Sequence, residues 1–174
     1  MPQPYESCSA KEHRESAPAS VRCAVVTVSD TRVLENDHSG DLIVAGLEGA
    51  GHCVVERVVV PDEPAALGDC LRRLAASGKV EAVLLTGGTG IAIRDQTPET
   101  LAALLTKPLP GYGELFRMLS YQEIGPAAML SRAAGGLIGE TLVLTMPGST
   151  AAVRLALDKL ILPELAHLVK HARR

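Results

Sequence analysis

The residues of this chain that could do chemistry are concentrated in residues 85–99, which read LTGGTGIAIRDQTPE. The segment follows an apolar run at 80–85 that is typical of a buried strand. Its three glycines free the backbone to turn sharply and approach a ligand, and successive N–H groups in such a turn form an anion-binding concavity. Arg94 and Asp95, a cation and a candidate metal ligand, come next. We interpret the segment as a phosphate site.

A glycine-rich turn is weak evidence alone, because a simple strand-to-loop turn has the same composition. No Gly-Lys-Ser/Thr follows the glycines, and the G-x-G-x-x-G spacing is absent, so neither a Walker loop nor a dinucleotide fingerprint is present. The following residues predict a helix start, with Thr97 as N-cap and Pro98 as the first helical residue.

Three further polar clusters follow predicted strands, and ligands bind at such strand ends in open α/β sheets. They are Ser29-Asp30, Asp62, and Pro147-Gly148-Ser149. Asp30 could instead cap a turn or helix, and Asp62 could be a turn residue. Ser149 could N-cap the last helix, a role compatible with anion binding.

The elements that must position these clusters alternate between strand and helix. We expect strands at 21–29, 52–60 and 80–86 and helices at 39–50, 64–77 and 97–105. We further expect a helix at 113–123, strands at 129–137 and 141–146 joined through 138–140, and a last helix from about 150 that kinks or restarts at Pro163. The alternation predicts an α/β fold with a mostly parallel sheet covered on both faces.

Length and composition predict one domain at 21–174 behind a polar, disordered tail at 1–20. Hydrophobic residues make up 47% of the chain, enough for a sizeable core. A net charge of −3 and only 2% aromatic residues argue against nucleic-acid binding. The sequence shows no secretory signal and no apolar stretch of membrane length, so we expect a reduced, cytoplasmic protein without a membrane partner.

Other reactive side chains show no catalytic or zinc-ligand spacing. Cys23 and Cys53 fall in apolar runs and are interpreted as reduced core residues, and Arg117 and Arg132 as surface residues. A glycine loop with carboxylates and arginines suits phosphoryl or nucleotidyl transfer, in which positioning and charge neutralisation do most of the catalytic work.

Six segments together resemble one family. They are VTVSD at 26–30, VPDE at 60–63, TGGTG at 86–90 with RD at 94–95 and TPE at 97–99, PGYGE at 110–114, MLSRA at 129–133 and MPGS at 146–149. In this order they resemble the MogA/MoaB-type molybdopterin adenylyltransferases of molybdenum cofactor synthesis, over about residue 21 to the C-terminus. Residues 114–125 look more like the MoaB branch.

The resemblance implies a three-layer α/β/α fold, usually a homotrimer, and a reaction in which Mg-ATP and molybdopterin give adenylyl-molybdopterin and pyrophosphate. It also implies hand-over of the product to the molybdenum-inserting protein. Asp62 and Asp95 are the expected catalytic residues and Mg²⁺ ligands. The expected ligand-binding residues are Ser29, Asp30, Thr86, Gly87, Gly88, Thr89, Gly90, Arg94, Gly111, Glu114, Ser131, Pro147, Gly148 and Ser149.

Two other functions remain open on the same fold. The chain could bind or carry molybdopterin without turnover, or be a nucleotide pyrophosphatase, because a fold does not fix a function. Arg94 could neutralise charge that develops in the reaction, or it could pair structurally with an acid.

Overall fold

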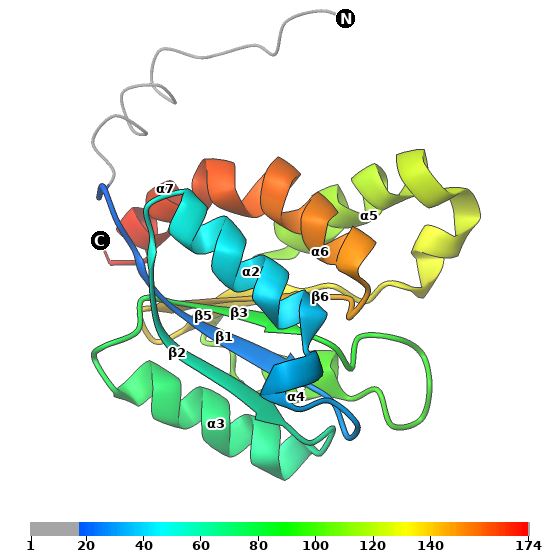
Figure 1. Ribbon diagram of the computed structural model, residues 1–174, viewed down its shortest axis with the longest axis horizontal. Helices are drawn as coiled ribbons and strands as arrows, with labels where there is room; N and C mark the ends of the chain where they lie inside the picture. The colour runs from blue at the N-terminus through cyan, green and yellow to red at the C-terminus, as the bar shows by residue number, and fades with distance from the viewer. Residues whose placement is uncertain (1–17, 174) are drawn as a thin grey trace, which may run out of the picture.

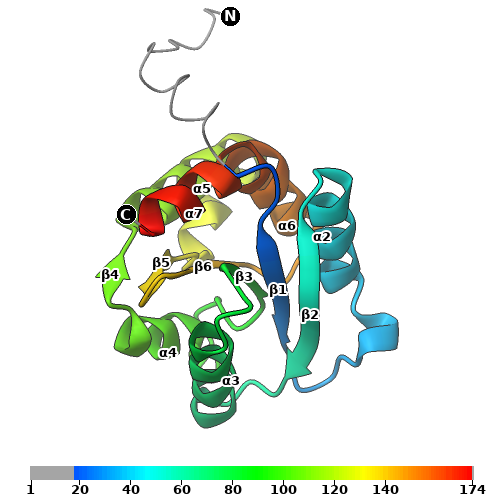
Figure 2. The same ribbon diagram turned by 90° about the vertical axis from the view of Figure 1, so that its left-hand side faces the viewer.

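A computed structural model describes residues 18–173, which form a six-stranded sheet between two helical layers (Figures 1 and 2). The sheet order is β2-β1-β3-β6-β5-β4. The strands are β1 (Arg22–Val28), β2 (Cys53–Val60), β3 (Ala82–Thr86), β4 (Lys107–Pro108), β5 (Gly135–Ile138) and β6 (Thr141–Met146). Most of the predicted tail, residues 1–17, lies outside the described part of the chain.

The helices divide between the two faces of the sheet as a three-layer α/β/α fold requires. They are α2 (His38–Gly49), α3 (Pro64–Ala76), α4 (Thr97–Leu104), α5 (Pro110–Ile124), α6 (Thr150–Ala156) and α7 (Leu162–Ala172), with short turns η1 (Leu34–Asn36), η2 (Gly125–Leu130) and the π-helical η3 (Leu157–Ile161). Helices α2, α5, α6 and α7 cover one face, and α3 and α4 cover the other (Figure 2). The predicted fold class is confirmed.

Four neighbouring strands are parallel, and this decides where the site lies. β1 pairs in parallel with β2 and β3, and β3 pairs in parallel with β6. β5 and β4 then extend the sheet in antiparallel fashion. The carboxyl ends of β2, β1, β3 and β6 therefore form one continuous edge of the sheet, on the right in Figure 1.

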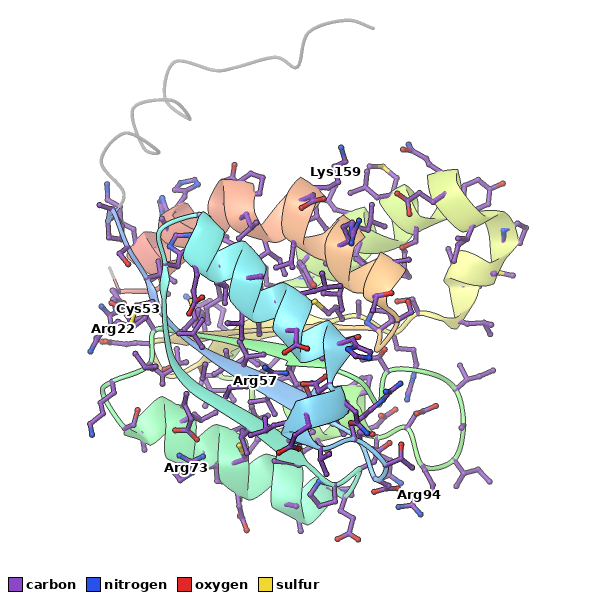
Figure 3. All side chains as sticks on the ribbon, in the orientation of Figure 1. Arg22, Cys53, Arg57, Arg73, Arg94 and Lys159 are labelled. Carbon is purple, nitrogen blue, oxygen red and sulfur yellow. The ribbon has the colours of Figure 1, made fainter. Side chains whose placement is uncertain are left out.

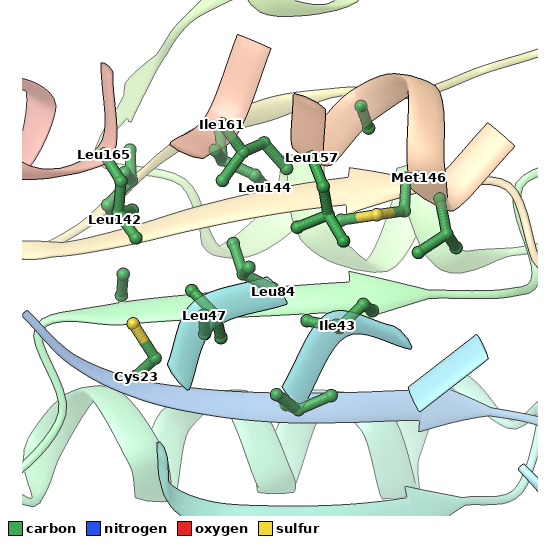
Figure 4. Close-up of a cluster of buried hydrophobic side chains, with 14 of the residues drawn as sticks. Cys23, Ile43, Leu47, Leu84, Leu142, Leu144, Met146, Leu157, Ile161 and Leu165 are labelled. Carbon is green, nitrogen blue, oxygen red and sulfur yellow. The ribbon is translucent and has the colours of Figure 1, made fainter. Parts of the chain in front are cut away.

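The core lies on both faces of the sheet, which is why its central strands are apolar throughout. On one face, Ile43 and Leu47 of α2 pack in a cluster with Leu84 of β3 (Figure 4). On the other face, Val26 and Leu85 pack in a cluster with the buried side of α3. A rigid sheet clamped from both sides holds the strand ends, and the loops that follow them, in fixed positions.

The predicted strand at 129–137 is wrong over most of its length. α5 ends at Gly125, whose φ of 63° breaks the helix, and the chain continues as η2 before the four-residue strand β5. The apolar side chains of Met129 and Leu130 are 79% and 53% exposed, so they do not belong to a buried strand. The two-residue edge strand β4 was not predicted.

The structure confirms the prediction for the C-terminal helix and corrects one of the two cysteine predictions. The predicted interruption at Pro163 is confirmed, because η3 precedes a new helix in whose first turn Pro163 lies. Cys53 opens the edge strand β2 and is exposed, so its interpretation as a core residue is wrong. Cys23 is buried, and burial raises the pKa of its thiol to about 12.

No helix among residues 18–173 combines the length and the apolar character that crossing a bilayer requires.

Candidate functional site

The loops after four parallel strands meet at one edge of the sheet and are tied to one another. The backbone N–H of Ser29, after β1, donates to the carbonyl of Val60 at the end of β2 (2.9 Å). The backbone N–H of Gly87, after β3, donates to the carbonyl of Met146 at the end of β6 (3.2 Å). The predicted clusters thus share one rim, as the sheet order requires.

Two glycines of the loop after β3 occupy backbone conformations and spaces that exclude a side chain. Gly87 has a φ of 100°, and a Cβ there would lie 2.2 Å from the carbonyl oxygen of Val28. Gly88 has a φ of 61°, and its Cβ would lie 2.3 Å from Oγ1 of Thr97. Glycine is therefore required at both positions for the loop to fold tightly against its neighbours.

Thr97 does not have the predicted role. It is the first residue of α4 and Gln96 is the N-cap, with no side-chain capping hydrogen bond. The backbone N–H of Thr97 donates to the carbonyl of Gly88 (3.1 Å), which ties the helix start to the glycine loop. Its buried hydroxyl has no hydrogen-bond partner among the described residues.

Asp62 and Asp95 both lie against the glycine loop. A Cβ placed on Gly88 would lie 3.1 Å from Oδ1 of Asp62. A Cβ placed on Gly90 would lie 2.6 Å from Oδ2 of Asp95. The Asp95 carboxylate also accepts from the backbone N–H of Ala92 (2.9 Å). Two acids separated by 33 positions in the sequence therefore flank the same glycine turn.

Asp62 lies close enough to the other acids of the rim for its pKa to respond to their charges. Burial raises the pKa of the half-buried Asp62 carboxyl, and the negative charges of Asp95 and Asp30 raise it further, against the opposing charge of Arg94. Repulsion between carboxylates marks a place where a cation is stabilising.

Arg94 and Asp30 form a bridge across the rim. Nη2 of Arg94 lies 2.8 Å from Oδ2 of Asp30, with the two side chains 67% and 41% exposed. The other Asp30 oxygen accepts from the backbone N–H of Asp62 (3.0 Å). Of the two roles open to Arg94, the structure shows the pairing with an acid. Arg94 lies at the carboxyl edge of the sheet, far from Arg22 and Cys53 at the opposite edge (Figure 3).

A cavity of about 400 Å³, the main cavity, opens beside the glycine loop. One side, which we call the loop wall, consists of Gly87, Gly88, Thr89, Gly90 and Asp95. The opposite side, the helix wall, consists of Phe116, Ser120 and Ile124 of α5 and Ala127, Ala128 and Leu130 of η2. Ser131, Pro147, Gly148, Ser149 and Ala152 complete the lining. The cavity is polar on one side and apolar on the other, as an organic phosphate ligand requires.

A second, more polar cavity of about 360 Å³ adjoins the main one. Both cavities are lined by Gly87, Gly148 and Ser149. The other residues that line the second cavity are Thr27, Val28, Ser29, Arg32, Asp37, His38, Ser39, Thr86 and Thr150. Ser149 lies between the two cavities, and its hydroxyl accepts from the backbone N–H of Ala152 (3.3 Å), so the predicted N-cap of the last helix is confirmed.

The predicted site residues divide into three groups by their positions. Gly87, Gly88, Thr89, Gly90, Asp95, Ser131, Pro147, Gly148 and Ser149 line the main cavity, and Ser29 and Thr86 line the second. Asp30, Asp62 and Arg94 lie on the adjoining rim. Gly111 and Glu114 lie in the first turns of α5, outside both cavities, because α5 faces the main cavity through Phe116, Ser120 and Ile124.

Arg132 was predicted to be a surface residue, and this is wrong. Its side chain is 30% exposed and makes three hydrogen bonds to the glycine loop and α4.

Asp37, a buried acid that lines the second cavity, was not predicted either. Its carboxylate accepts from the hydroxyl of Thr27 (2.7 Å), the backbone N–H of Gly40 (3.0 Å) and Arg57 (3.1 Å). The position of Asp37 just before the predicted helix at 39–50 was the available signal.

The acids at the rim fit a cation that arrives with a phosphate ligand. Within residues 18–173, no three His, Cys, Asp or Glu side chains form a group that could hold a metal by themselves. Mg²⁺ at phosphate sites takes only one or two carboxylates and completes its shell with water and substrate phosphates. Asp62 and Asp95 beside the glycine loop satisfy that requirement.

Comparison with known proteins identifies the family. A family described as "Probable molybdopterin binding domain" matches residues 24–167. Molybdenum cofactor biosynthesis protein B of Bacillus subtilis is 52% identical over 167 residues, 95% of this chain and 98% of that protein. The chain belongs to the molybdenum cofactor biosynthesis protein B family.

Solved structures of this family share the fold. A crystal structure of a molybdenum cofactor biosynthesis protein B aligns with a TM-score of 0.88 at 50% identity, covering 91% of this chain and 99% of the other. The tungsten cofactor synthesizing protein MoaB from Pyrococcus furiosus aligns with a TM-score of 0.80 at 38% identity, covering 91% and 100%.

Proposed function

We propose that this chain catalyses the Mg-ATP-dependent adenylylation of molybdopterin, releasing pyrophosphate. The observation that carries the proposal is the placement of Asp62 and Asp95 against the Gly87–Gly90 turn, at the mouth of a cavity with an apolar wall. Such a site offers backbone donors for phosphates, carboxylates for a cation and room for an organic ring system. Membership of the molybdenum cofactor biosynthesis family supports molybdopterin as that organic partner.

The loop wall is the nucleotide-phosphate side in this proposal. Backbone N–H groups of the loop at residues 86–90, other than that of Gly87, which donates to Met146, bind the ATP phosphates in the concave turn. Asp62 and Asp95 would hold Mg²⁺, which neutralises phosphate charge when it is bound. Arg94, paired with Asp30, adds a positive charge at the rim without leaving its partner.

The nucleophile in this reaction needs no general base. The terminal phosphate of molybdopterin has a second pKa of about 6 and is largely a dianion at neutral pH. One of its oxygens forms a bond to the α-phosphorus of ATP while the bond from that phosphorus to the bridging oxygen breaks, and pyrophosphate leaves. The protein therefore has to position the two phosphates and neutralise their charge, and Asp62 and Asp95 serve the cation rather than accept a proton.

The pterin side lies toward the helix wall. Ser131 and Ser149 line the main cavity and supply hydroxyls for the pterin or its phosphate. The helix wall supplies Phe116 and Ile124 for contact with the ring. Ser149 also places its hydroxyl at the start of α6, where anions are stabilised by the helix N-terminus.

The test is pyrophosphate release from Mg-ATP with and without purified molybdopterin, for the wild type and Asp95→Ala. We expect release that depends on molybdopterin and falls to a small residual rate in the variant. A folded wild type that binds molybdopterin but releases no pyrophosphate would be a carrier. Release from nucleotides without molybdopterin would instead indicate a pyrophosphatase.

We further propose a cytoplasmic homotrimer that hands its product to the molybdenum-inserting protein, as the family resemblance implies. The surface of α5 and η2 supports assembly, because it exposes large apolar side chains. These are Leu115, Met118, Tyr121, Ile124, Met129 and Leu130, which we call the α5 patch. Contiguous exposed apolar surface of this kind commonly marks an interaction site.

A further inference from the structure

Arg132 is the main tie between the segment after η2 and the loop that carries Asp95. Its backbone N–H donates to the carbonyl of Thr89 (3.2 Å). Its Nε donates to the carbonyl of Gly90 (2.7 Å), and its Nη2 donates to the carbonyl of Asp95. Its Nη1 donates to the carboxylate of Glu99 in the first turn of α4.

These contacts close the loop at its base. The carbonyls of Gly90 and Asp95 are five residues apart in the chain, and one guanidinium holds both of them. The same group holds Glu99, so the loop, the start of α4 and the segment after η2 are fixed relative to one another. Only a planar group with several donors in fixed directions can make these bonds together, and lysine cannot.

Arg132 does not line the main cavity. Its neighbour Ser131 lines that cavity, whereas Arg132 lines a separate hollow of about 440 Å³ together with Asp95 and Gln96. The hydrogen bond from Arg132 to Asp95 is made to the backbone carbonyl, whereas the Asp95 carboxylate accepts from Ala92.

We infer that Arg132 is a positioning residue for Asp95, fixing the carboxylate against the glycine turn where the ATP phosphates and their cation bind. The inference rests on the proposed function for its catalytic consequence. The structural part of the inference, that the Arg132 guanidinium orders the loop at residues 90–95, does not depend on that function.

The first experiment compares pyrophosphate release by Arg132→Lys, Asp95→Ala and the double variant. We expect kcat of Arg132→Lys to fall about 10²-fold with a smaller change in the KM for molybdopterin, because small misplacements of a catalytic group have effects of this size. Since Arg132 acts through Asp95, the double variant should be no slower than Asp95→Ala alone. Arg72→Lys is the matched control, because Arg72 pairs with Asp69 on α3, away from the site.

The second experiment measures hydrogen exchange of the amides at 91–95 in the same proteins without substrates. We expect faster exchange in Arg132→Lys and unchanged exchange in Arg72→Lys. Wild-type exchange and wild-type kcat in Arg132→Lys would overturn the inference, as would multiplicative losses in the double variant. If the wild type itself releases no pyrophosphate, the proposed function fails, and the exchange rates alone then decide whether Arg132 orders the loop.

Discussion

The two walls of the main cavity are held in different ways. The loop wall is fixed by hydrogen bonds from three other segments: β6 holds Gly87, the start of α4 holds Gly88, and Arg132 holds Gly90 and Asp95. The helix wall is fixed by packing through Phe116, while its neighbours on the outer surface of α5 and η2 are exposed. The hydrogen bonds that fix the cavity lining are therefore on the loop wall, and the apolar surface is on the side of the helix wall.

This difference separates two tasks. Phosphoryl chemistry depends on charges held to within fractions of an ångström, which a loop tied at several points provides. Recognition of a ring system or of another protein chain depends more on apolar area, which the helix wall and the α5 patch provide. The comparison predicts that substitutions on the loop wall change the reaction rate, whereas substitutions on the α5 patch change association.

Among the substitutions that test this comparison, the largest effect should come from Asp62, a carboxylate of the rim that does not line the main cavity. Asp62→Asn keeps the shape and removes the charge, and we expect a loss of about 10²-fold in kcat, a few kcal/mol of transition-state stabilisation. Glu63→Gln, the exposed neighbour, is the control and should be unchanged. Steady-state pyrophosphate release measures both, and full activity in Asp62→Asn would remove Asp62 from the chemistry.

The next effect tests whether the loop wall is as tightly held as its contacts indicate. Gly87→Ala adds a methyl group against the carbonyl of Val28 at a positive φ, and should lower stability by about 3 kcal/mol, roughly 6–12 °C in Tm. Gly49→Ala, whose added methyl meets nothing within 4 Å, should be neutral or slightly stabilising. Thermal unfolding monitored by circular dichroism compares the two variants. Equal Tm values would show that the loop can shift to accept a side chain at position 87.

A smaller effect on the reaction is expected from the α5 patch. Met118→Glu with Tyr121→Glu places two charges on this exposed apolar surface. We expect the proposed trimer to dissociate while the protein still binds Mg-ATP, because neither residue lines the main cavity. Light scattering after size exclusion measures the mass, with Gln122→Glu as the control. A trimer that persists in the double variant would place the interface elsewhere.

The smallest effect should come from Ser149, which lies between the two cavities. Ser149→Ala removes the N-cap of α6 and should cost about 1 kcal/mol of stability. Ser149→Asp keeps a capping oxygen and should preserve stability, while its charge weakens binding of an anionic ligand. Chemical unfolding and titration with molybdopterin separate the two roles, and unchanged affinity in both variants would leave Ser149 as a cap only.

The rim could be predicted because each of its clusters directly follows an apolar strand. Ser29, Asp62, Gly87 and Pro147 come together through the parallel order of four strands, which the βαβ pattern implies. The glycine loop, Asp95 and the cap at Ser149 are local features that a sequence displays directly.

The rest depends on contacts between distant residues. Arg132 meets Gly90 across 42 positions, so its sequence neighbourhood gives no sign of a structural role. Exposed Met129 and Leu130 resemble strand residues in the sequence, because apolarity alone does not distinguish a core from an exposed apolar surface. Cys53 opens an edge strand, and whether a strand lies at an edge is decided only when the whole sheet is assembled.

The close fit of Gly87 has an evolutionary consequence. Its backbone lies between the carbonyl of Val28 and that of Met146, so the loops after β1, β3 and β6 share one crowded point. A larger residue at position 87 requires a compensating shift of the chain at Val28, the last residue of β1. Substitutions there are therefore epistatic, and the loops after β1 and β3 must diverge together.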